Sequence, residues 1–379
     1  MTIKINRESF LHALESVQSG LSPKDNPEQA NCFVFLEGKI HTYNDEITCS
    51  IASPLGKSFK GATNAKKLLD VLRRLQDEEF DVKATSSELI FLGKRKKASF
   101  RLEAEVLLPI DDLEKPGKWK TLPKDFGDAV QIVHQCCGAD DSQFNLVCVH
   151  IGSNWIESCD QFQVCRWPIK LDVKESVLIR GASLKHMAAF GMTEFSDMTG
   201  WVHFRNAQGL VMSFKRYVDD YPDLAKHLEG KGEPITLSKG LAEAAATCEV
   251  FSADDADNNV VVITVRDGKM RVRGESTLGS YEEVKTVKYE GEEISFGMSP
   301  KVLADIVKRH TDCLLCPGKL KVDGGNYQYI SCLYEMKSKK EQEEETKEDF
   351  TKKAKEKAAK VFSNGKAKEK QLVASKEDE

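Results

Sequence analysis

Apolar and polar positions along the chain repeat three times, at a spacing of about 115 residues. Each copy begins with a segment in which apolar residues recur at i, i+4 and i+7, the spacing that places them on one face of an α-helix. The three segments are residues 7–17 with Phe10, Leu14 and Val17, residues 123–133 with Phe126, Val130 and Val133, and residues 238–248 with Leu241, Ala245 and Cys248. Each segment predicts a short amphipathic helix.

Three further elements follow each of these helices in the same order. β-branched and aromatic runs broken by a glycine-containing turn predict a hairpin at residues 32–40, 146–152 and 260–268. A second helix is predicted at residues 64–74, 182–188 and 299–309. Asn64 and Ser299 are its expected N-caps, and Pro300 suits a first turn. A closing hairpin is predicted at residues 80–92, 201–214 and 313–333. The repetition predicts an α+β fold of three modules, each with two helices packed on antiparallel sheet.

The repeats predict three domains, at residues 1–117, 118–231 and 232–338, and 379 residues are enough for three separate cores. From residue 337 the chain becomes rich in lysine and acid, so residues 339–379 are expected to form a charged tail, disordered or loosely helical. No apolar run approaches the roughly 20 residues of a membrane span. Residues 1–6 are predicted to be a strand and not a signal peptide.

Cysteine usage and motif content argue against a secreted protein and against an enzyme. The eleven cysteines follow no disulfide-framework spacing, which suits a reducing cytoplasm. Cys313 and Cys316 form a lone CxxC with only His310 nearby, which favours structural thiols over a zinc site. Phosphate-loop, dinucleotide, zinc-protease and nucleophile-elbow motifs are missing from the sequence, and its adjacent acids lie beside loop signals. We expect no catalytic site, no cofactor and no metal.

Several segments share their order and spacing with one known family. They are residues 62–70, 165–169, 221–223, 281–284, 287–292, 294–299 and 326–333. Tyr221-Pro222-Asp223, for example, is similar to a Phe-Pro-Asp-Tyr motif of that family. Together with the threefold repeat, these segments resemble the bacterial DNA polymerase III beta subunit, a DNA sliding clamp, along residues 1–338. The sequence departs from the family at Gln161, at Ser299 and at Cys332-Leu333, which indicates a divergent member, and a virus-encoded protein is one interpretation.

The resemblance implies half of a closed ring, completed by a head-to-tail homodimer in which the first domain meets the third. It also implies the partners: duplex DNA bound without sequence preference, a replicative DNA polymerase, a clamp-loader ATPase and a second copy of the chain. A membrane is not among them, and the location implied is the cytoplasm of a bacterial cell or of an infected host. A polymerase tethered to such a ring would stay at a high local concentration near the primer end.

Basic residues on the predicted helices are candidates for DNA contact, because lysines that line a hole attract phosphates without reading bases. The chain has a net charge of −5, so local clusters matter more than the sum. Lys24 matches a basic position of the family. The predicted DNA-binding residues are Lys24, Lys66, Lys67, Arg73, Arg74, Lys124, Lys185, Lys239, Lys301, Lys308 and Arg309. For any single lysine, the alternative of a solvated polar helix face is favoured.

Two further sites follow from the resemblance alone. An apolar pocket between the second and third domains would accept a short linear peptide of a partner protein. Its matching positions are Phe144, Phe162, Pro222, Lys226, His227, Ile330 and Cys332. A dimer seam would bring Phe100 and Leu102 against Val250 and Phe251. The alternative for both sets is ordinary packing inside a domain.

The function that the sequence predicts is therefore a DNA sliding clamp, a processivity factor for DNA replication, without enzymatic activity. One alternative is a clamp-like decoy that occupies host replication proteins without encircling DNA. A nuclease or glycosylase on an unrelated α+β fold is a second alternative, and the scattered acids argue against it. The three visible repeats disfavour a trimeric ring of two-domain subunits.

Overall fold

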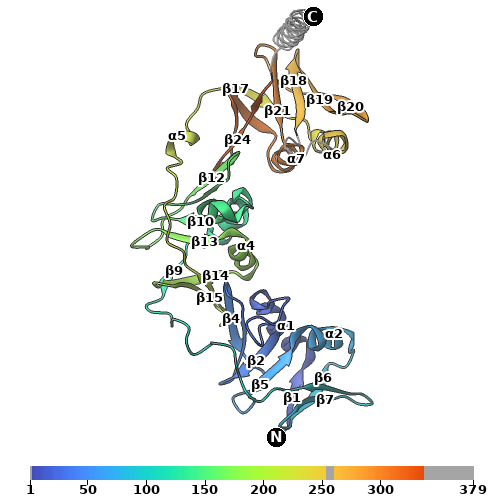
Figure 1. The fold of residues 1–379 in the computed structure, drawn as a ribbon, viewed down its shortest axis with the longest axis vertical. Helices are drawn as coiled ribbons and strands as arrows, with labels where there is room; N and C mark the ends of the chain where they lie inside the picture. The colour runs from blue at the N-terminus through green and yellow to red at the C-terminus, as the bar shows by residue number, and fades with distance from the viewer. Residues whose placement is uncertain (1, 253–259, 337–379) are drawn as a thin grey trace, which may run out of the picture. The chain divides into compact units, whose positions relative to one another are not determined.

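The computed structural model describes residues 2–252 and 260–336, which form two compact units (Figure 1). Unit 1 contains the residues up to 231 together with 320–331, and unit 2 contains residues 232–319 together with the described residues from 332 onward. The units separate after residue 231, and the expected bounds of the three domains stay a prediction. The predicted charged tail at 339–379 lies outside the described residues.

The first repeat lies in unit 1. Its helices are α1 (Arg7–Ser16), the short 3-10 helix η1 (Gln18–Gly20) and α2 (Ala65–Arg74). Its strands are β1 (Thr2–Asn6), β2 (Cys32–Leu36), β3 (Lys39–Tyr43), β4 (Ile47–Ala52), β5 (Gly61–Asn64), β6 (Glu79–Ala84), β7 (Glu88–Leu92) and β8 (Lys97–Arg101). The Asn6 side chain accepts a hydrogen bond from the Ser9 backbone N at 2.9 Å and so begins α1.

The core of the first repeat is aromatic. The ring of Phe10 on α1 lies 6.3 Å from that of Phe35 and 5.9 Å from that of Phe91, and all three side chains are fully buried. These rings join α1 to two sheets, one with the order β1-β6-β7-β8 and one that contains β2 to β5. The amphipathic pattern of the helix is therefore satisfied by packing on strands.

The second repeat follows in unit 1. Its helices are α3 (Phe126–Val133), η2 (His134–Cys136), η3 (Asp141–Val147), α4 (Gly181–Leu184), η4 (Lys185–Phe190) and α5 (Ala225–Leu228). Its strands are β9 (Lys120–Thr121), β10 (Cys148–Ile151), β11 (Trp155–Cys159), β12 (Gln163–Pro168), β13 (Val177–Arg180), β14 (Met192–Asp197), β15 (Trp201–Asn206) and β16 (Val211–Lys215).

Antiparallel sheets join the elements of unit 1. Strand β4 pairs with β16, with Cys49 opposite Met212, so the two repeats share one continuous sheet. Its strand order is β5-β2-β3-β4-β16-β15-β14-β9. The other strands of the second repeat are ordered β13-β10-β11-β12 and continue into β24 (Gln328–Cys332) and β23 (Lys319–Asp323). The last hairpin of the chain thus extends a sheet of the second repeat.

The third repeat supplies unit 2. Its elements are β17 (Glu233–Thr236), α6 (Leu241–Ser252), β18 (Val261–Arg266), β19 (Lys269–Ser276), β20 (Gly279–Thr286), β21 (Ile294–Met298), α7 (Pro300–Arg309), β22 (Asp312–Cys316) and β25 (Tyr334–Glu335). Strands β20-β19-β18-β21-β25 form an antiparallel sheet, and β17 pairs with β22. Helix α6 packs against α7 and against strands β19 and β20.

The predicted order of helix, hairpin, helix and closing hairpin is present in every repeat, which confirms the α+β fold of three modules. Two details differ from the prediction. Ser299 precedes α7 without a side-chain capping bond, although Pro300 does occupy the first turn. The second helix of the middle repeat is α-helical only in α4 and continues as the 3-10 helix η4. Its buried Leu184 and Met187 are three positions apart, the period of a 3-10 helix.

Candidate nucleic-acid and peptide interfaces

Helix α2 separates apolar from basic side chains. Leu68, Leu69 and Leu72 are buried, whereas four basic residues of the same helix are exposed. These four, the α2 cations, are Lys66, Lys67, Arg73 and Arg74. The Asn64 side chain accepts a hydrogen bond from the Lys67 backbone N at 3.1 Å, which begins the helix as predicted. Packing and capping therefore fix the α2 backbone and leave its basic side in solvent.

The other predicted DNA-binding residues are exposed as well. Three lie on α7, which buries Leu303, Ile306 and Val307 on its opposite side. The remaining ones are found in η4, in the turns before α3 and α6, and in the loop after η1. In chain order these seven are Lys24, Lys124, Lys185, Lys239, Lys301, Lys308 and Arg309. Their exposure agrees with phosphate contact and equally with a solvated helix face, so DNA contact stays a prediction.

Two of these cations are already paired with carboxylates. Arg73 lies 2.9 Å from Glu15 of α1, and Lys308 lies 3.6 Å from Asp305 within α7. Exposed ion pairs of this kind contribute about 0–1 kcal/mol to stability. A phosphate that binds either cation would have to compete with the neighbouring carboxylate.

The connector, defined as residues 216–232 between β16 and β17, carries three of the predicted peptide contacts. Pro222, Lys226 and His227 are exposed. Leu224 and Leu228, which flank Lys226 and His227 in the chain, are 2% and 5% exposed. The Leu228 carbonyl accepts a hydrogen bond from Lys321 Nζ at 2.9 Å. The connector is therefore anchored at intervals on unit 1, and its predicted contact residues face solvent between the anchors.

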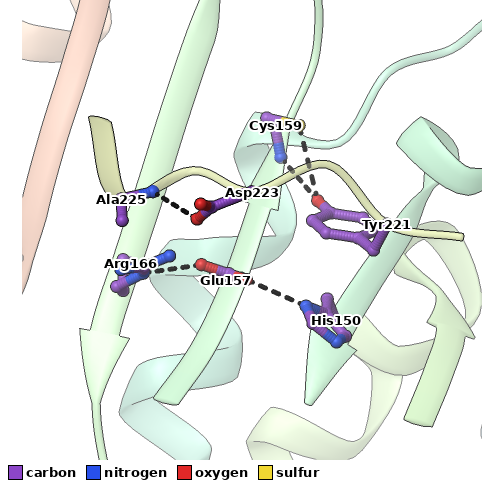
Figure 2. A network of polar contacts seen from close by, with 7 residues as sticks. All are labelled: His150, Glu157, Cys159, Arg166, Tyr221, Asp223 and Ala225. Atoms are coloured by element: carbon purple, nitrogen blue, oxygen red, sulfur yellow. Dashed lines mark hydrogen bonds and ion pairs between the residues drawn. The ribbon is translucent and has the colours of Figure 1, made fainter. Parts of the chain in front are cut away.

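A buried polar network lies under the start of the connector (Figure 2). Glu157 on β11 is 2% exposed and accepts hydrogen bonds from Arg166 Nε on β12 at 2.6 Å and from His150 Nδ1 on β10 at 2.9 Å. The Arg166 guanidinium also lies 4.9 Å from the centre of the Trp155 ring. A carboxylate can be buried at this depth because two donors, one of them a guanidinium, replace its water.

Tyr221 of the connector closes this network. Its ring lies 4.6 Å from the His150 ring, and its hydroxyl accepts a hydrogen bond from the Cys159 backbone N at 3.0 Å. Burial raises the pKa of Tyr221, so the phenol keeps its proton and can donate it toward Cys159 Sγ, 3.6 Å away. This contact of the connector thus comes directly before Pro222 in the chain.

The other predicted pocket residues lie in different surroundings. Phe162, 44% exposed, stands on the turn between β11 and β12, where Asp160 Oδ1 accepts a hydrogen bond from the Phe162 backbone N at 2.7 Å. Ile330 on β24 is buried and paired with Val164 of β12. The half-buried Phe144 packs on Tyr217, with 4.5 Å between ring centres. Cys332 is exposed. The pocket itself stays a prediction.

The predicted seam residues divide into two kinds. Phe100 and Leu102 are 9% and 5% exposed, and the Phe100 ring meets that of Phe91 edge-on at 5.6 Å. Val250 on α6 is 70% exposed, and the half-buried Phe251 stacks on Tyr281 of β20 with 6.5 Å between ring centres. In unit 1 the seam residues thus also fill their own core, and Val250 in unit 2 does not.

A metal centre and a membrane span were also sought in the described parts of the chain. Residues 2–252 and 260–336 contain no group of three or more His, Cys, Asp or Glu side chains placed to hold a metal ion. Cys313 and Cys316 are both buried free thiols, and burial raises the pKa of Cys313 to about 12. No helix among these residues is both long and apolar enough to cross a membrane.

Solved structures resemble this chain over most of its length, whereas no protein-family model and no curated protein matches its sequence. The DNA polymerase III beta chain of Streptococcus pneumoniae superimposes with a TM-score of 0.75 at 14% identity, over 88% of this chain and 100% of that one. The beta subunit of Thermotoga maritima gives 0.74 at 13%, and a sliding clamp of Pseudomonas aeruginosa bound to griselimycin gives 0.73 at 12%, each over 89% of this chain and 100% of the other. The chain has the sliding-clamp fold.

The clamp fold confirms the resemblance that the sequence motifs indicated. Sequence reasoning nevertheless missed the network under the connector. Glu157 was the available signal, because a charged residue inside the apolar strand around Ile156 predicts a buried partner. Its partners His150 and Arg166 could not be identified, since only the strand register brings them beside it.

Proposed function

We propose that this protein is a DNA sliding clamp that encircles duplex DNA as a head-to-tail homodimer and tethers the replicative polymerase through a peptide pocket. The observation that carries the proposal is the sliding-clamp fold, which covers the full length of solved clamps at TM-scores of 0.73 to 0.75. In this proposal the protein holds DNA and partner proteins, and it catalyses no reaction of its own.

Exposed cations support the proposed contact with DNA. The α2 cations stand on a helix fixed by a cap and by buried leucines, so their positions do not depend on a mobile loop. Lysine and arginine on such a surface bind phosphates without reading bases, which permits movement along the duplex. A clamp-loader ATPase would place the ring on DNA.

Two sheet edges support the proposed homodimer. Strand β8 is the last strand of its sheet in unit 1, and β20 is the last strand of its sheet in unit 2. Large exposed apolar side chains gather around β20: Val250 is 70% exposed, Leu278 86% and Val284 47%. Free strand edges and exposed apolar groups both favour pairing with another chain. Pairing of β8 with β20 of a second copy would cover both edges.

The connector and the β11–β12 turn support the proposed peptide site. The turn is held by a hydrogen bond to Asp160 and the connector by its buried leucines, and both present exposed side chains, among them Pro222 and Phe162. A Pseudomonas aeruginosa clamp was solved bound to griselimycin, and we propose that this compound would occupy the same site here and so serve as its probe. In this proposal the natural ligand of the pocket is a short peptide segment of the replicative polymerase.

The test combines mass in solution with retention on DNA. We expect light scattering to give the mass of two chains. The protein, incubated at high concentration with nicked circular DNA, should then co-elute with it in gel filtration and should be lost when the DNA is cut to a linear form. A monomeric mass, or retention that does not depend on circularity, would contradict encirclement. Partner binding without such retention would instead indicate the decoy.

A further inference from the structure

We propose that Tyr221 is a latch that holds the connector on the sheet of the second repeat, and that Glu157 orients this latch through His150. Both are positioning residues for the peptide site, because neither is exposed enough to be a main contact. The role in peptide binding rests on the proposed function. The latch itself is a property of unit 1 alone.

The latch completes a strand ladder that would otherwise end with an unpaired donor. Strand β10 pairs with β11 at His150 opposite Glu157 and at Ile151 opposite Ile156. Beyond this point the Cys159 backbone N–H of β11 finds its acceptor in the Tyr221 hydroxyl, at 3.0 Å. Cys159 is only 3% exposed, so water cannot easily replace this acceptor. Loss of the hydroxyl would leave a buried donor without a partner, which is costly.

Glu157 fixes the surface on which Tyr221 rests. An ionised carboxylate only accepts hydrogen bonds, so His150 must donate from Nδ1, and this sets the orientation of its ring. The Tyr221 ring then packs on the His150 ring, with the two planes tilted by 32°. Arg166 holds the second carboxylate oxygen at 2.6 Å, which leaves Glu157 little freedom to rotate. The position of Tyr221 therefore depends on His150, and the orientation of His150 depends on Glu157.

The latch acts on the predicted contact residues through the short chain that follows it. Pro222 comes next, and Asp223 Oδ1 accepts a hydrogen bond from the Ala225 backbone N at 3.0 Å (Figure 2). Leu224 is buried one residue later. Pro222 thus lies between the half-buried Tyr221 and the buried Leu224, which are three positions apart. Release of Tyr221 would free Pro222 and the turn that leads to Lys226.

Amide hydrogen exchange on the full-length protein tests the latch directly. In Tyr221→Phe the ring and its packing on His150 remain, and only the hydroxyl is lost. We expect exchange of the Cys159 amide and of residues 221–226 to rise by roughly tenfold or more, as for the loss of one buried hydrogen bond. Exchange in β1 to β8 should stay unchanged, which excludes general unfolding. Tyr289→Phe is the matched control, since its hydroxyl bonds an exposed carbonyl, that of Glu292.

Glu157→Gln tests the second part of the proposal. The amide keeps the shape of the side chain but replaces one acceptor oxygen with a donor, so we expect increased exchange at Cys159, by a smaller factor than in Tyr221→Phe. Unchanged exchange at Cys159 in Tyr221→Phe would overturn the latch. Increased exchange in Tyr221→Phe but not in Glu157→Gln would overturn the role of Glu157.

Binding of griselimycin to the same variants tests the positioning role. If the latch positions the site, Tyr221→Phe and Glu157→Gln should bind the probe several-fold more weakly than the wild-type protein and the Tyr289→Phe control. Equal affinity of all four proteins for griselimycin, together with increased exchange at Cys159 in Tyr221→Phe and Glu157→Gln, would overturn the positioning role. A wild-type protein that does not bind griselimycin would contradict the peptide site of the proposed function, and the exchange measurements would still decide the latch.

Discussion

The Arg73 guanidinium on α2 donates two hydrogen bonds to one carboxylate oxygen of Glu15 on α1, from Nε at 3.0 Å and from a terminal nitrogen at 2.9 Å. The pair joins the last turns of the two helices, and both side chains are more than a third exposed. One of the predicted DNA-binding cations is therefore held by an acid of the neighbouring helix.

Removal of that acid should strengthen contact with DNA. In Glu15→Gln the Arg73 guanidinium loses its charged partner and becomes available to a phosphate, so we expect tighter binding to a short linear duplex. The slope of log affinity against log salt should steepen by about 0.9, the value for one more neutralised phosphate. Fluorescence anisotropy across a salt series measures this. Glu8→Gln on the same helix is the matched control, and an equal effect of both changes would contradict a specific role of the pair.

Charge reversal of the α2 cations should abolish retention on DNA. Lys66, Lys67, Arg73 and Arg74 are exposed, so their replacement by Glu should leave the fold intact and weaken association with duplex DNA by about a hundredfold or more at 0.1 M salt. Retention on nicked circular DNA is the measurement. Replacement of four exposed lysines outside the helices changes the net charge equally and is the control; its members are Lys39, Lys57, Lys60 and Lys118. Equal loss in both variants would show that only net charge matters.

Val250→Asp should convert the proposed dimer to monomers. Val250 is 70% exposed on α6, so a charge there should cost little folding stability, but it would be desolvated at a seam with a second copy. Light scattering at several protein concentrations gives the mass. Val218→Asp is the control, because Val218 is 89% exposed and lies on the connector. A dimer that survives Val250→Asp would argue against the predicted seam. Phe251→Asp should act in the same direction, with an added loss of stacking on Tyr281.

Stability should fall in mild acid because of a buried histidine. Burial lowers the pKa of His203 to about 4, and its Nδ1 lies 2.7 Å from Ser213 Oγ. The unfolded chain takes up a proton near pH 6.5, whereas the folded chain does not until about pH 4. The contribution of His203 to the free energy of unfolding is therefore fully present above pH 6.5. It falls by up to about 1.4 kcal/mol per pH unit as the pH falls toward 4.

His203→Gln should flatten this dependence. Glutamine can still bond Ser213 but does not titrate, so the loss of unfolding free energy between pH 7 and pH 5 should shrink by about 2 kcal/mol or less. Urea unfolding at the two pH values measures the difference. The same replacement at the exposed His12 is the control. An identical pH slope in wild type and His203→Gln would contradict the role of this imidazole.

Local patterns predicted the helices and most hairpins because their physical causes are local. In α2 the leucines recur with the helical period, Asn64 caps the first turn, and the basic residues occupy the remaining positions. Such a segment carries its own start signal and its own buried face. Exposure of the seven predicted cations on α2 and α7 follows from the same pattern.

Long-range pairing could not be predicted in this way. The pairing of β4 with β16 brings together residues more than 150 positions apart in the chain. The pairing of β12 with β24 does the same. The end of the middle repeat's second helix also depended on its surroundings, because Leu184 and Met187 are buried with 3-10 spacing although the local sequence favours an α-helix. Ser299 shows the converse, since a suitable capping residue made no capping bond.

The sequence by itself determined the three repeats, their helices and the basic faces that those helices expose, since periodicity and capping act within a few residues of the chain. Only the tertiary structure decided which residues meet Glu157 and which backbone donor Tyr221 satisfies. These contacts depend on the register of three strands and on the path of the connector above them. A buried carboxylate can be recognised in a sequence by its apolar neighbours, but its partners are chosen by the packing that removes it from water.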